Sequence, residues 1–388
     1  MRILNSLYYY RPHYSGLTVY TERLARHLAA RGHDVTVLTS RYNRELPAEE
    51  QVDGVTVKRL PVLLKVSKGP IMPTLTIAAM REFRHNEILH LHVPQLDAAP
   101  LALFGKLFGV PVVLTYHCDL RLPDSLLNRI AGLLSEIANR ISVSLADVVV
   151  ANTRDYAEES ATLSQVLDKV EVISPPIEIP EPNAQREQAL RENLAIKDGQ
   201  PLIGMAARLA SEKGAEYLAQ ALPRVLDVYP DARVLYVGQY KDVLGEEEYG
   251  RRLAPMLAEL GEQWTFMGIL DPEDLAAFFS ICDVTVLPSL NSTESFGMVQ
   301  VESMLCGTPV VASDLPGVRQ PISATGMGLT VPPGDAHSLA GAILSILEEP
   351  ERFIKSREQI ADRYAAEVIA DKYETLFRSL LGDDGAPA

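Results

Sequence analysis

A regular alternation of strand-like apolar runs with amphipathic, helix-like stretches constrains the fold more than any other feature of the sequence. In residues 1–178 the strand-like runs are RILNSLY, VTVLTS, VTVKRL, EILHLH, PVVLTYH, DVVVANT and VEVISP. Stretches such as LTVYTERLARHLAARG lie between several of them. This rhythm is typical of a mostly parallel sheet with helices on both faces. We therefore predict an α/β, doubly wound, Rossmann-like domain.

A second series of the same kind follows, with the runs PLIGMAA, ARVLYVG, WTFMG, DVTVLPS, TPVVAS and GLTVPP. The proline-rich, polar segment SPPIEIPEPNAQ separates the two series and resembles a linker. A chain of 388 residues is also long for one hydrophobic core. We predict tandem Rossmann-like domains at 1–178 and 200–360, a linker at 179–199, and a terminal helix with a polar tail at 361–388. Both sheets would bind ligands at the carboxyl ends of their strands, in a cleft between the domains.

The net charge of −15 makes nucleic acid a poor partner, but the charge is unevenly distributed. Residues 1–150 carry a net charge of +4, and the remainder carries −19. The basic first half favours an anionic contact, such as a membrane surface or a phosphorylated acceptor. Drift of surface composition between two domains explains the asymmetry equally well.

The three cysteines, Cys118, Cys282 and Cys306, are scattered and form no CxxC motif. This usage argues against a disulfide framework and favours a reducing compartment. The first ten residues become polar too early for a signal peptide, and no apolar run reaches the roughly 20 residues of a membrane span. We expect a cytoplasmic protein, with association at the inner membrane face as the open alternative.

Two cations follow the first strand of the second series. Arg208 comes directly after PLIGMAA, and Lys213 precedes Gly214 at the start of a predicted helix. A guanidinium can bind a phosphate with two hydrogen bonds, and an ammonium beside a helix N-terminus adds positive charge. We favour a site for a diphosphate over the alternative of a solvated basic turn.

The stretch ESFGMVQVE places Glu294 and Glu302 eight positions apart. We predict a helix that Ser295 caps and Gly307 ends. Eight helical positions span roughly 12 Å. The carboxylate pairs of glycoside hydrolases are about 5–9.5 Å apart. The two glutamates are therefore expected to contact different parts of one extended ligand.

The binding groups around this helix follow the same order as the sugar, the diphosphate and the ribose of a nucleotide diphosphate sugar. Backbone amides at Phe296, Gly297 and Met298 can bind a diphosphate, and the glycine allows close approach. Glu294 can accept hydrogen bonds from sugar hydroxyls, and Glu302 can accept them from a ribose. A single glutamate at the end of a helix or on its surface would ordinarily be a solvated acid. The prediction therefore rests on the two glutamates and the two cations taken together.

In the first domain, the loop YYYRPHYSG follows the first strand and lacks GxGxxG, which counts against a nicotinamide dehydrogenase. Tyr14 can stack on a sugar or acceptor, and Ser15 and Gly16 form the turn. His117 and Asp119 follow the strand PVVLTYH and are candidates for contacts in the cleft. For His117 taken alone, a structural histidine is almost as good an interpretation.

Metal binding is not expected. We predict that the rings of His90 and His92 point to opposite faces of their strand and cannot chelate one ion. Neither domain contains a DxD motif of the kind that binds a diphosphate through Mn²⁺ or Mg²⁺. We predict no cofactor and no divalent metal, with Arg208 and Lys213 in the place of the cation.

One predicted helix, LPDSLLNRIAGLLSEIANRI, has an apolar stripe that we expect to face the core. Contact with a membrane interface is the second interpretation. It is supported by the basic first half and by the segment VLLKVSKGPIM, which we expect to be exposed. The stripe comprises Leu126, Leu127, Ile130, Leu133, Leu134, Ile137 and Ile141.

Taken together, these motifs resemble the retaining glycosyltransferases of family 4, which have the GT-B fold. The resemblance covers nearly the whole chain and rests on several segments. They are SGLTVYTERLARHLAARGHDVTVLT, ILHLH, TYHCD, DVVVANTRDYAEES, the Arg208 and Lys213 pair, the E-x7-E motif from Glu294 to Glu302, and CGTPVVASDLPGVRQPI.

The resemblance implies a role for each matching residue. Arg208 and Lys213 would bind the donor diphosphate, and Glu302 the ribose. Glu294 and His117 would contact the donor sugar near the reacting centre. The remaining implied contacts are the amides of Phe296, Gly297, Met298 and Val299, Leu270 at the nucleobase, Gly16 near the phosphate, and Tyr14, Ser15 and Asp119 on the acceptor side.

The resemblance further implies transfer of a hexose from a UDP- or GDP-linked sugar to a hydroxyl acceptor, with retention of configuration. It also implies domain closure and a terminal helix that crosses back to the first domain. A lipid-linked acceptor, in glycolipid or polysaccharide assembly, is the favoured partner. A nucleotide-sugar epimerase or hydrolase of the same fold, and a non-catalytic nucleotide-sugar binding protein, remain the alternatives.

Overall fold

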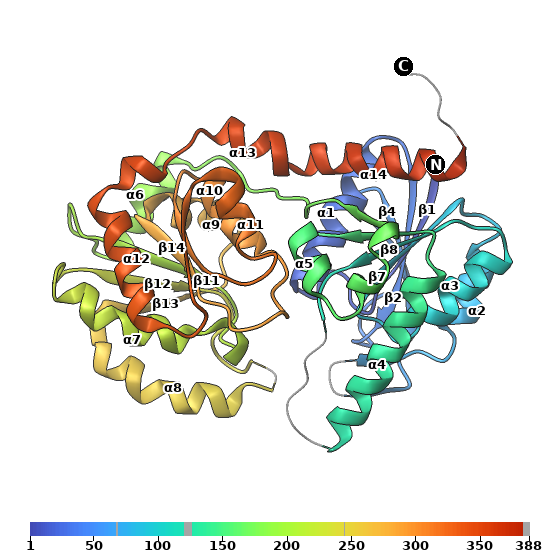
Figure 1. Ribbon diagram of the computed structural model, residues 1–388, viewed down its shortest axis with the longest axis horizontal. Helices are drawn as coiled ribbons and strands as arrows, with labels where there is room; N and C mark the ends of the chain where they lie inside the picture. Colours follow the sequence, from blue (N-terminus) through green and yellow to red (C-terminus); the bar gives the residue numbers. More distant parts are fainter. Residues whose placement is uncertain (67–68, 120–125, 244, 383–388) are drawn as a thin grey trace. The chain divides into compact units, whose positions relative to one another are not determined.

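The computed structural model describes residues 1–66, 69–119, 126–243 and 245–382. The chain forms two compact units, each with its own parallel sheet (Figure 1). The first unit comprises residues 1–176 together with the end of the chain from Ala365, and the second comprises Ile177–Tyr364. Each unit is the Rossmann-like α/β domain that the alternating pattern predicts.

The first unit is built on a sheet of eight described strands in the order β10-β9-β8-β7-β1-β2-β4-β3. All neighbours are parallel except β3 and β4, which pair antiparallel at the edge. A small hairpin, β5 and β6, lies outside this sheet. The strands are β1 (Arg2–Ser6), β2 (Asp34–Arg41), β3 (Glu49–Val52), β4 (Val55–Pro61), β5 (Leu64–Val66), β6 (Gly69–Ile71), β7 (Ile88–Val93), β8 (Val112–Tyr116), β9 (Val148–Ala151) and β10 (Val170–Val172).

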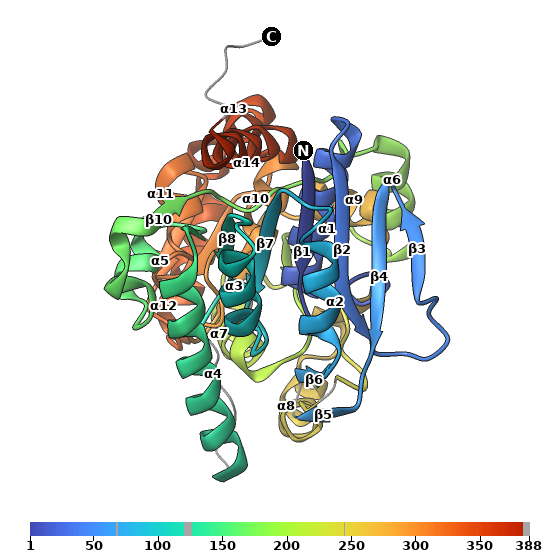
Figure 2. The same ribbon diagram turned by 90° about the vertical axis from the view of Figure 1, so that its right-hand side faces the viewer.

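Helices cover both faces of this sheet (Figure 2). Neighbouring residues of a strand point to opposite faces, so the apolar strands present side chains on both faces that helices must cover. On β7, Leu89 packs with α2, α3 and α5, whereas Ile88 packs with α1 and α14. The helices are α1 (Gly16–Ala30), α2 (Leu75–Glu82), α3 (Ala98–Leu107), α4 (Leu126–Leu145), α5 (Arg154–Glu159) and α14 (Ala366–Leu381), with short 3-10 turns at Leu163–Gln165 and Leu167–Lys169.

The second unit has a sheet of six described strands, all parallel, in the order β13-β12-β11-β14-β15-β16. One of its two cores packs against α7 and α12, and the other against α9 and α10. Its strands are β11 (Leu202–Ala206), β12 (Arg233–Val237), β13 (Trp264–Gly268), β14 (Val284–Leu287), β15 (Val310–Ser313) and β16 (Gly328–Val331). Its helices are α6 (Ala184–Asn193), α7 (Ala215–Leu226), α8 (Glu247–Leu260), α9 (Pro272–Ile281), α10 (Met298–Leu305), α11 (Gln320–Thr325), α12 (Ala336–Glu348) and α13 (Arg357–Tyr364), with 3-10 turns at Ser211–Lys213, Gly261–Gln263 and Pro350–Phe353.

The segment 179–199 is not the linker that its prolines suggested. It lies within the second unit and contains α6, which Asn183 caps through its side chain. Leu190 and Leu194 pack against the core beside α9. The prolines thus precede a helix and do not interrupt it.

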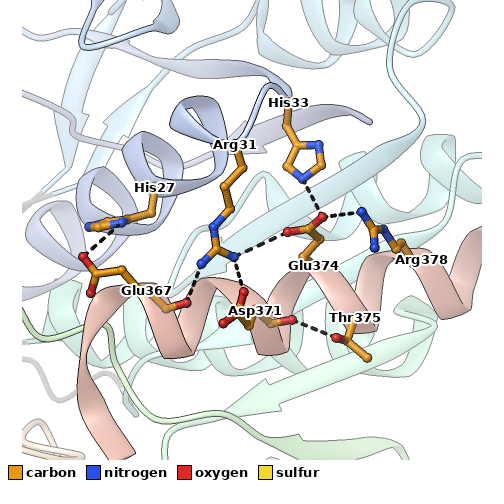
Figure 3. A network of polar contacts seen from close by, with 8 residues as sticks. All are labelled: His27, Arg31, His33, Glu367, Asp371, Glu374, Thr375 and Arg378. Atoms are coloured by element: carbon orange, nitrogen blue, oxygen red, sulfur yellow. Dashed lines mark hydrogen bonds and ion pairs between the residues drawn. The ribbon is translucent and has the colours of Figure 1, made fainter. Parts of the chain in front are cut away.

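The terminal helix α14 belongs to the first unit, although α13 just before it belongs to the second. Polar contacts hold it to the end of α1 (Figure 3). Arg31 Nη1 lies 2.8 Å from a carboxylate oxygen of Asp371, and Nη2 donates a 2.7 Å hydrogen bond to the Glu367 carbonyl oxygen. The other face of α14 contributes Ile369, Tyr373 and Phe377 to the core, all fully buried.

The apolar stripe of α4 does not face the core, which corrects the prediction from its periodicity. Four of its residues are 45–59% exposed: Leu133, Leu134, Ile137 and Ile141. The buried side of α4 is formed by small or polar residues instead, namely Ser135, Asn139, Ser142 and Val143. The other three predicted stripe residues lie outside the described side chains. Periodicity locates an apolar stripe but does not say what covers it.

Candidate functional site

The start of α10 forms the centre of the candidate site in the second unit. The helix begins at Met298, with Gly297 at its N-cap in the left-handed region, at φ +77°. Ser295 is therefore not the cap that the sequence suggested. Because Glu294 lies in the preceding loop, the estimate of helical spacing between Glu294 and Glu302 does not apply. The amides of Met298 and Val299 belong to the first turn, where a helix has no internal acceptors for them.

Lys213 and Glu294 form a direct ion pair, with Lys213 Nζ 2.5 Å from a carboxylate oxygen. Both side chains are largely buried, with exposed fractions of 22% and 17%. The structure thus brings together two residues that are 81 positions apart in the sequence. A cation and a carboxylate at one place can bind the charged and the hydroxyl-bearing parts of one ligand.

Arg208 lies two residues beyond the end of β11 and forms an ion pair with Glu212. Its side chain is 41% exposed, so solvent reaches the guanidinium. The sequence prediction gave Glu212 no role, and because Arg208 lies in a loop and not in a helix, no helical spacing indicated the pair. Glu246 adds a further carboxylate, which accepts a 3.0 Å hydrogen bond from the amide of Ser211.

Gly214 explains how these segments approach one another. It adopts φ +67°, and a Cβ atom built on it would lie 2.1 Å from the Pro288 carbonyl oxygen. The backbone after Lys213 therefore packs directly on the loop after β14, and only glycine fits. Pro288 begins the loop that leads to Glu294, so this contact brings Lys213 within reach of the carboxylate.

The other predicted donor residues lie around the same helix. Glu302 is one turn into α10 and is only 6% exposed. Phe296 is buried in the core and fixes the loop before the helix, where its ring contacts Tyr364. Leu270 follows β13 and is partly buried against the same core, as is Val299.

In the first unit, the predicted turn after β1 begins α1. Ser15 caps the helix by accepting a 3.2 Å hydrogen bond from the Thr18 amide, and Gly16 is the first helical residue. Tyr14 is 70% exposed, and the Arg11 guanidinium lies 4.1 Å from the centre of its ring. Tyr14 is therefore accessible to a ligand, whereas the Ser15 hydroxyl serves the helix.

His117 and Asp119 follow β8, as the pattern predicted. Asp119 accepts hydrogen bonds from the hydroxyls of Tyr116 and Ser160, at 2.8 and 2.9 Å. His117 is only 8% exposed, and burial lowers its pKa to about 3. At neutral pH the His117 imidazole is uncharged, so it can contact a ligand by hydrogen bonding and not by charge.

The prediction for His90 and His92 is wrong. Residues two positions apart in a strand share a face. Their ring centres lie 4.2 Å apart, and His92 Nδ1 is 3.1 Å from His117 Nε2. Three histidines therefore cluster, but two of their other ring nitrogens contact residues outside the cluster: His90 Nε2 is 2.7 Å from Thr115 Oγ1, and His92 Nε2 is 3.2 Å from Asn5 Oδ1. In the described residues, no group of three or more His, Cys, Asp or Glu side chains is arranged to hold a metal ion.

Two sequence families match the chain, one over each unit. The family of glycosyl transferases group 1 matches residues 186–366, and a glycosyl transferase 4-like domain matches residues 15–176. The chain is a glycosyltransferase with a group 1 domain at residues 186–366. The two matches lie on the two Rossmann-like units of a GT-B fold, as the motifs in the sequence indicated.

This glycosyltransferase is similar to several known proteins. It is 29% identical to the D-inositol 3-phosphate glycosyltransferase of Acidothermus cellulolyticus, over 86% of this chain and 78% of that one. It is 28% identical to the phosphatidyl-myo-inositol mannosyltransferase of Mycobacterium leprae, over 94% of each chain. Among solved structures, Anabaena HepE in complex with UDP has the same fold, with a TM-score of 0.78 and 20% identity over 98% of this chain and all of that one.

Proposed function

We propose that this glycosyltransferase moves a hexose from a UDP- or GDP-linked sugar to a hydroxyl acceptor, with retention of the anomeric configuration and without a divalent metal. The observation that carries the proposal is the ion pair of Lys213 with Glu294, four residues before α10 begins, together with Arg208, which pairs with the neighbouring Glu212. Two cations and two amides of a first helical turn, which have no acceptor within the helix, suit a diphosphate. HepE, whose fold this chain shares, was solved with UDP and with UDP-glucose.

Each residue has a chemical task in this proposal. Arg208, Lys213 and the amides of Met298 and Val299 stabilise the negative charge that develops on the leaving diphosphate. Glu302 accepts hydrogen bonds from the ribose, and Glu294 accepts them from the sugar. These contacts accelerate transfer to the extent that they are stronger in the transition state than in the ground state.

The proposed stereochemistry assigns no protein nucleophile. The acceptor oxygen attacks the anomeric carbon from the face that the diphosphate leaves, and its proton passes to a diphosphate oxygen. The carboxylate of Glu294 contacts the donor sugar as positive charge develops at its anomeric centre. For His117, in the first unit, the proposed role is a hydrogen bond from the uncharged imidazole to a sugar. Asp119 and Tyr14 lie on the acceptor side, where Tyr14 has the exposed ring that stacking on a sugar requires.

The experiment that tests this function is release of nucleotide from a panel of UDP- and GDP-sugars, with a pool of lipid-linked and free sugar acceptors and with or without EDTA. We expect one donor to turn over at the same rate in EDTA, and the anomeric configuration of the product to match that of the donor. Release without an acceptor would instead favour the hydrolase or epimerase alternative. Binding of the nucleotide without any turnover would favour a binding protein.

We further propose that the acceptor is carried by an anionic membrane, which the first unit contacts. The exposed stripe from Leu133 to Ile141 on α4 supports this, as does the β5–β6 hairpin, where Leu63 and Leu64 are 70% and 49% exposed. Exposed Lys65 lies on the same hairpin. Leucines beside a lysine suit an interface with anionic lipids. None of the helices in the described ranges is long and apolar enough to cross a bilayer.

Sedimentation with lipid vesicles tests the membrane contact. We expect the protein to bind vesicles that contain anionic phospholipid, and a Leu133→Gln, Leu134→Gln variant to lose most of this binding. Ile354→Gln, which changes an exposed apolar residue of the second unit, is the control and should bind as the wild type does. Equal binding by both variants would refute the proposed contact. Self-association that the α4 variant abolishes would show that a second copy covers the stripe.

A further inference from the structure

The core between the first sheet and helices α1 and α14 contains polar groups that the proposed reaction does not use. His90, His92 and Thr115 project into it from β7 and β8, and Tyr373 enters it from α14. All four side chains are buried without measurable exposure. Burying polar groups costs free energy unless they form hydrogen bonds, so their arrangement calls for an explanation in contacts.

Two of the contacts hold the His117 ring. His92 Nδ1 lies 3.1 Å from His117 Nε2, which fixes one edge of the imidazole. The ring of Tyr20, from α1, packs edge-on against the imidazole, with ring centres 4.7 Å apart and planes at 90°. The position of His117 therefore depends on where Tyr20 is held.

Tyr373 anchors Tyr20 from the end of the chain. The two hydroxyl oxygens lie 2.7 Å apart, across 353 positions of sequence. Tyr373 is itself 2.8 Å from Thr115 Oγ1, which lies 2.7 Å from His90 Nε2. Burial raises the pKa of both tyrosines, so both phenols keep their protons at neutral pH and can donate hydrogen bonds.

The direction of this chain of hydrogen bonds follows from His90. Its Nδ1 is buried and has no hydrogen-bond partner in the described part of the chain. An unpaired acceptor costs less than an unpaired donor, so the proton of the neutral ring belongs on Nε2. His90 then donates to Thr115, Thr115 donates to Tyr373, and Tyr373 donates to Tyr20. The hydroxyls of Thr115 and Tyr373 thus have fixed orientations.

We propose that Tyr373 of α14 is a positioning residue for His117, because its hydroxyl fixes the Tyr20 ring that packs edge-on against the imidazole. The role of His117 in transfer rests on the proposed function, whereas its orientation by Tyr20 and Tyr373 can be measured without substrate. The terminal helix would then contribute to the site of the first unit and not only to its stability.

Tyr373→Phe tests the proposal because it removes the hydroxyl and keeps the ring. We expect kcat to fall about tenfold, with the donor KM unchanged, because a misplaced contact weakens the transition state more than donor binding. Tyr20→Phe should cause a similar loss, and the double variant no further loss. Ile369→Val, which loosens the packing of α14 in the same core without touching the hydroxyls, should keep the wild-type kcat.

A spectroscopic measurement separates this proposal from the proposed function. In ligand-free protein with ¹⁵N-labelled histidine, Tyr373→Phe should shift the imidazole resonances of His117, whereas Ile369→Val should leave them in place. Unshifted resonances would overturn the positioning role whether or not transfer is found. In an active enzyme, unchanged kcat in Tyr373→Phe, or additive losses in the double variant, would overturn it as well.

Discussion

Lys213 Nζ lies 2.5 Å from a carboxylate oxygen of Glu294, so the cation proposed for the diphosphate is paired with the carboxylate proposed for the sugar. When a complete donor binds, its phosphate can take the place of Glu294 as the partner of Lys213. Its sugar hydroxyls can take the place of Lys213 as the partner of Glu294. A nucleoside diphosphate without its sugar satisfies only the lysine and leaves Glu294 largely buried without its cation. The pair therefore favours the intact donor over the product nucleotide.

Glu294→Gln should change binding and turnover in opposite directions. Removal of the carboxylate releases Lys213, so we expect UDP or GDP to bind about 3- to 10-fold more tightly, which corresponds to roughly 0.7–1.4 kcal/mol. Transfer should fall by about 100-fold or more because the contact to the sugar is weakened. Titration calorimetry and initial rates measure the two effects. Glu262→Gln removes the same charge at an exposed position of the second unit and is the control. Equal nucleotide affinity in the two variants would contradict the idea that Glu294 competes with the phosphate for Lys213.

Arg208→Lys should show that the shape of the cation matters as well as its charge. A lysine keeps the positive charge but loses the two-pronged geometry that binds a phosphate, so we expect nucleotide affinity to fall about tenfold. Arg252→Lys, at a 70% exposed arginine of α8, should bind the nucleotide as the wild type does. Wild-type affinity in Arg208→Lys would mean that Arg208 contributes charge alone or lies outside the site.

Gly214→Ala should damage the site through the backbone. The added Cβ would meet the Pro288 carbonyl oxygen at 2.1 Å in a left-handed conformation, which costs roughly 1–3 kcal/mol or more. We expect a lower urea midpoint and weaker nucleotide binding, because the lysine and the Glu294 loop move apart. Gly250→Ala, within α8 and with no atom within 4 Å of the new Cβ, should be neutral or slightly stabilising. Similar behaviour of the two variants would argue against the close approach.

The histidine cluster predicts how stability depends on pH. Burial lowers the pKa of His90 and His117 to about 3 and that of His92 well below its usual value. In the unfolded chain these rings gain protons below about pH 6.5, so the unfolded state binds more protons between about pH 6.5 and 3. The free energy of unfolding should therefore fall as the pH falls through this range, by up to about 1.4 kcal/mol per pH unit for each ring.

Urea unfolding at pH 7, 6 and 5 measures this slope. His90→Asn should reduce it, because one buried imidazole is removed while a hydrogen-bonding side chain remains beside Thr115. His85→Asn, at an exposed position, should leave the slope unchanged. A wild-type slope in His90→Asn would show that the buried cluster does not control acid sensitivity.

The fold followed from the sequence because parallel strands buried on both faces have a strong local signature. The runs EILHLH and PVVLTYH became β7 and β8, and the six runs of the second series became β11 to β16. The edge strand β3 and the hairpin of β5 and β6 were missed. Glu49–Val52 contains three polar residues, and such edges depend on the neighbouring strand more than on their own apolar pattern.

The candidate site was predicted less completely, because several of its contacts join distant parts of the chain. Motif spacing indicated Arg208, Lys213 and Glu294, but not that two of them pair with each other. The contact of Tyr373 with Tyr20 spans almost the entire chain, and no local pattern points to it. The apolar stripe of α4 was visible in the sequence, but whether it faces the core depends on tertiary packing.

The binding of UDP and GDP in EDTA by wild type and by an Arg208→Ala, Lys213→Ala variant tests the central claim most directly. We predict that the wild type binds at least one of the two nucleotides without a metal, and that the double variant binds it at least about 100-fold more weakly while its urea midpoint stays close to that of the wild type. Equal affinity in the folded double variant, or wild-type binding that EDTA abolishes, would contradict a metal-free diphosphate site formed by these two residues.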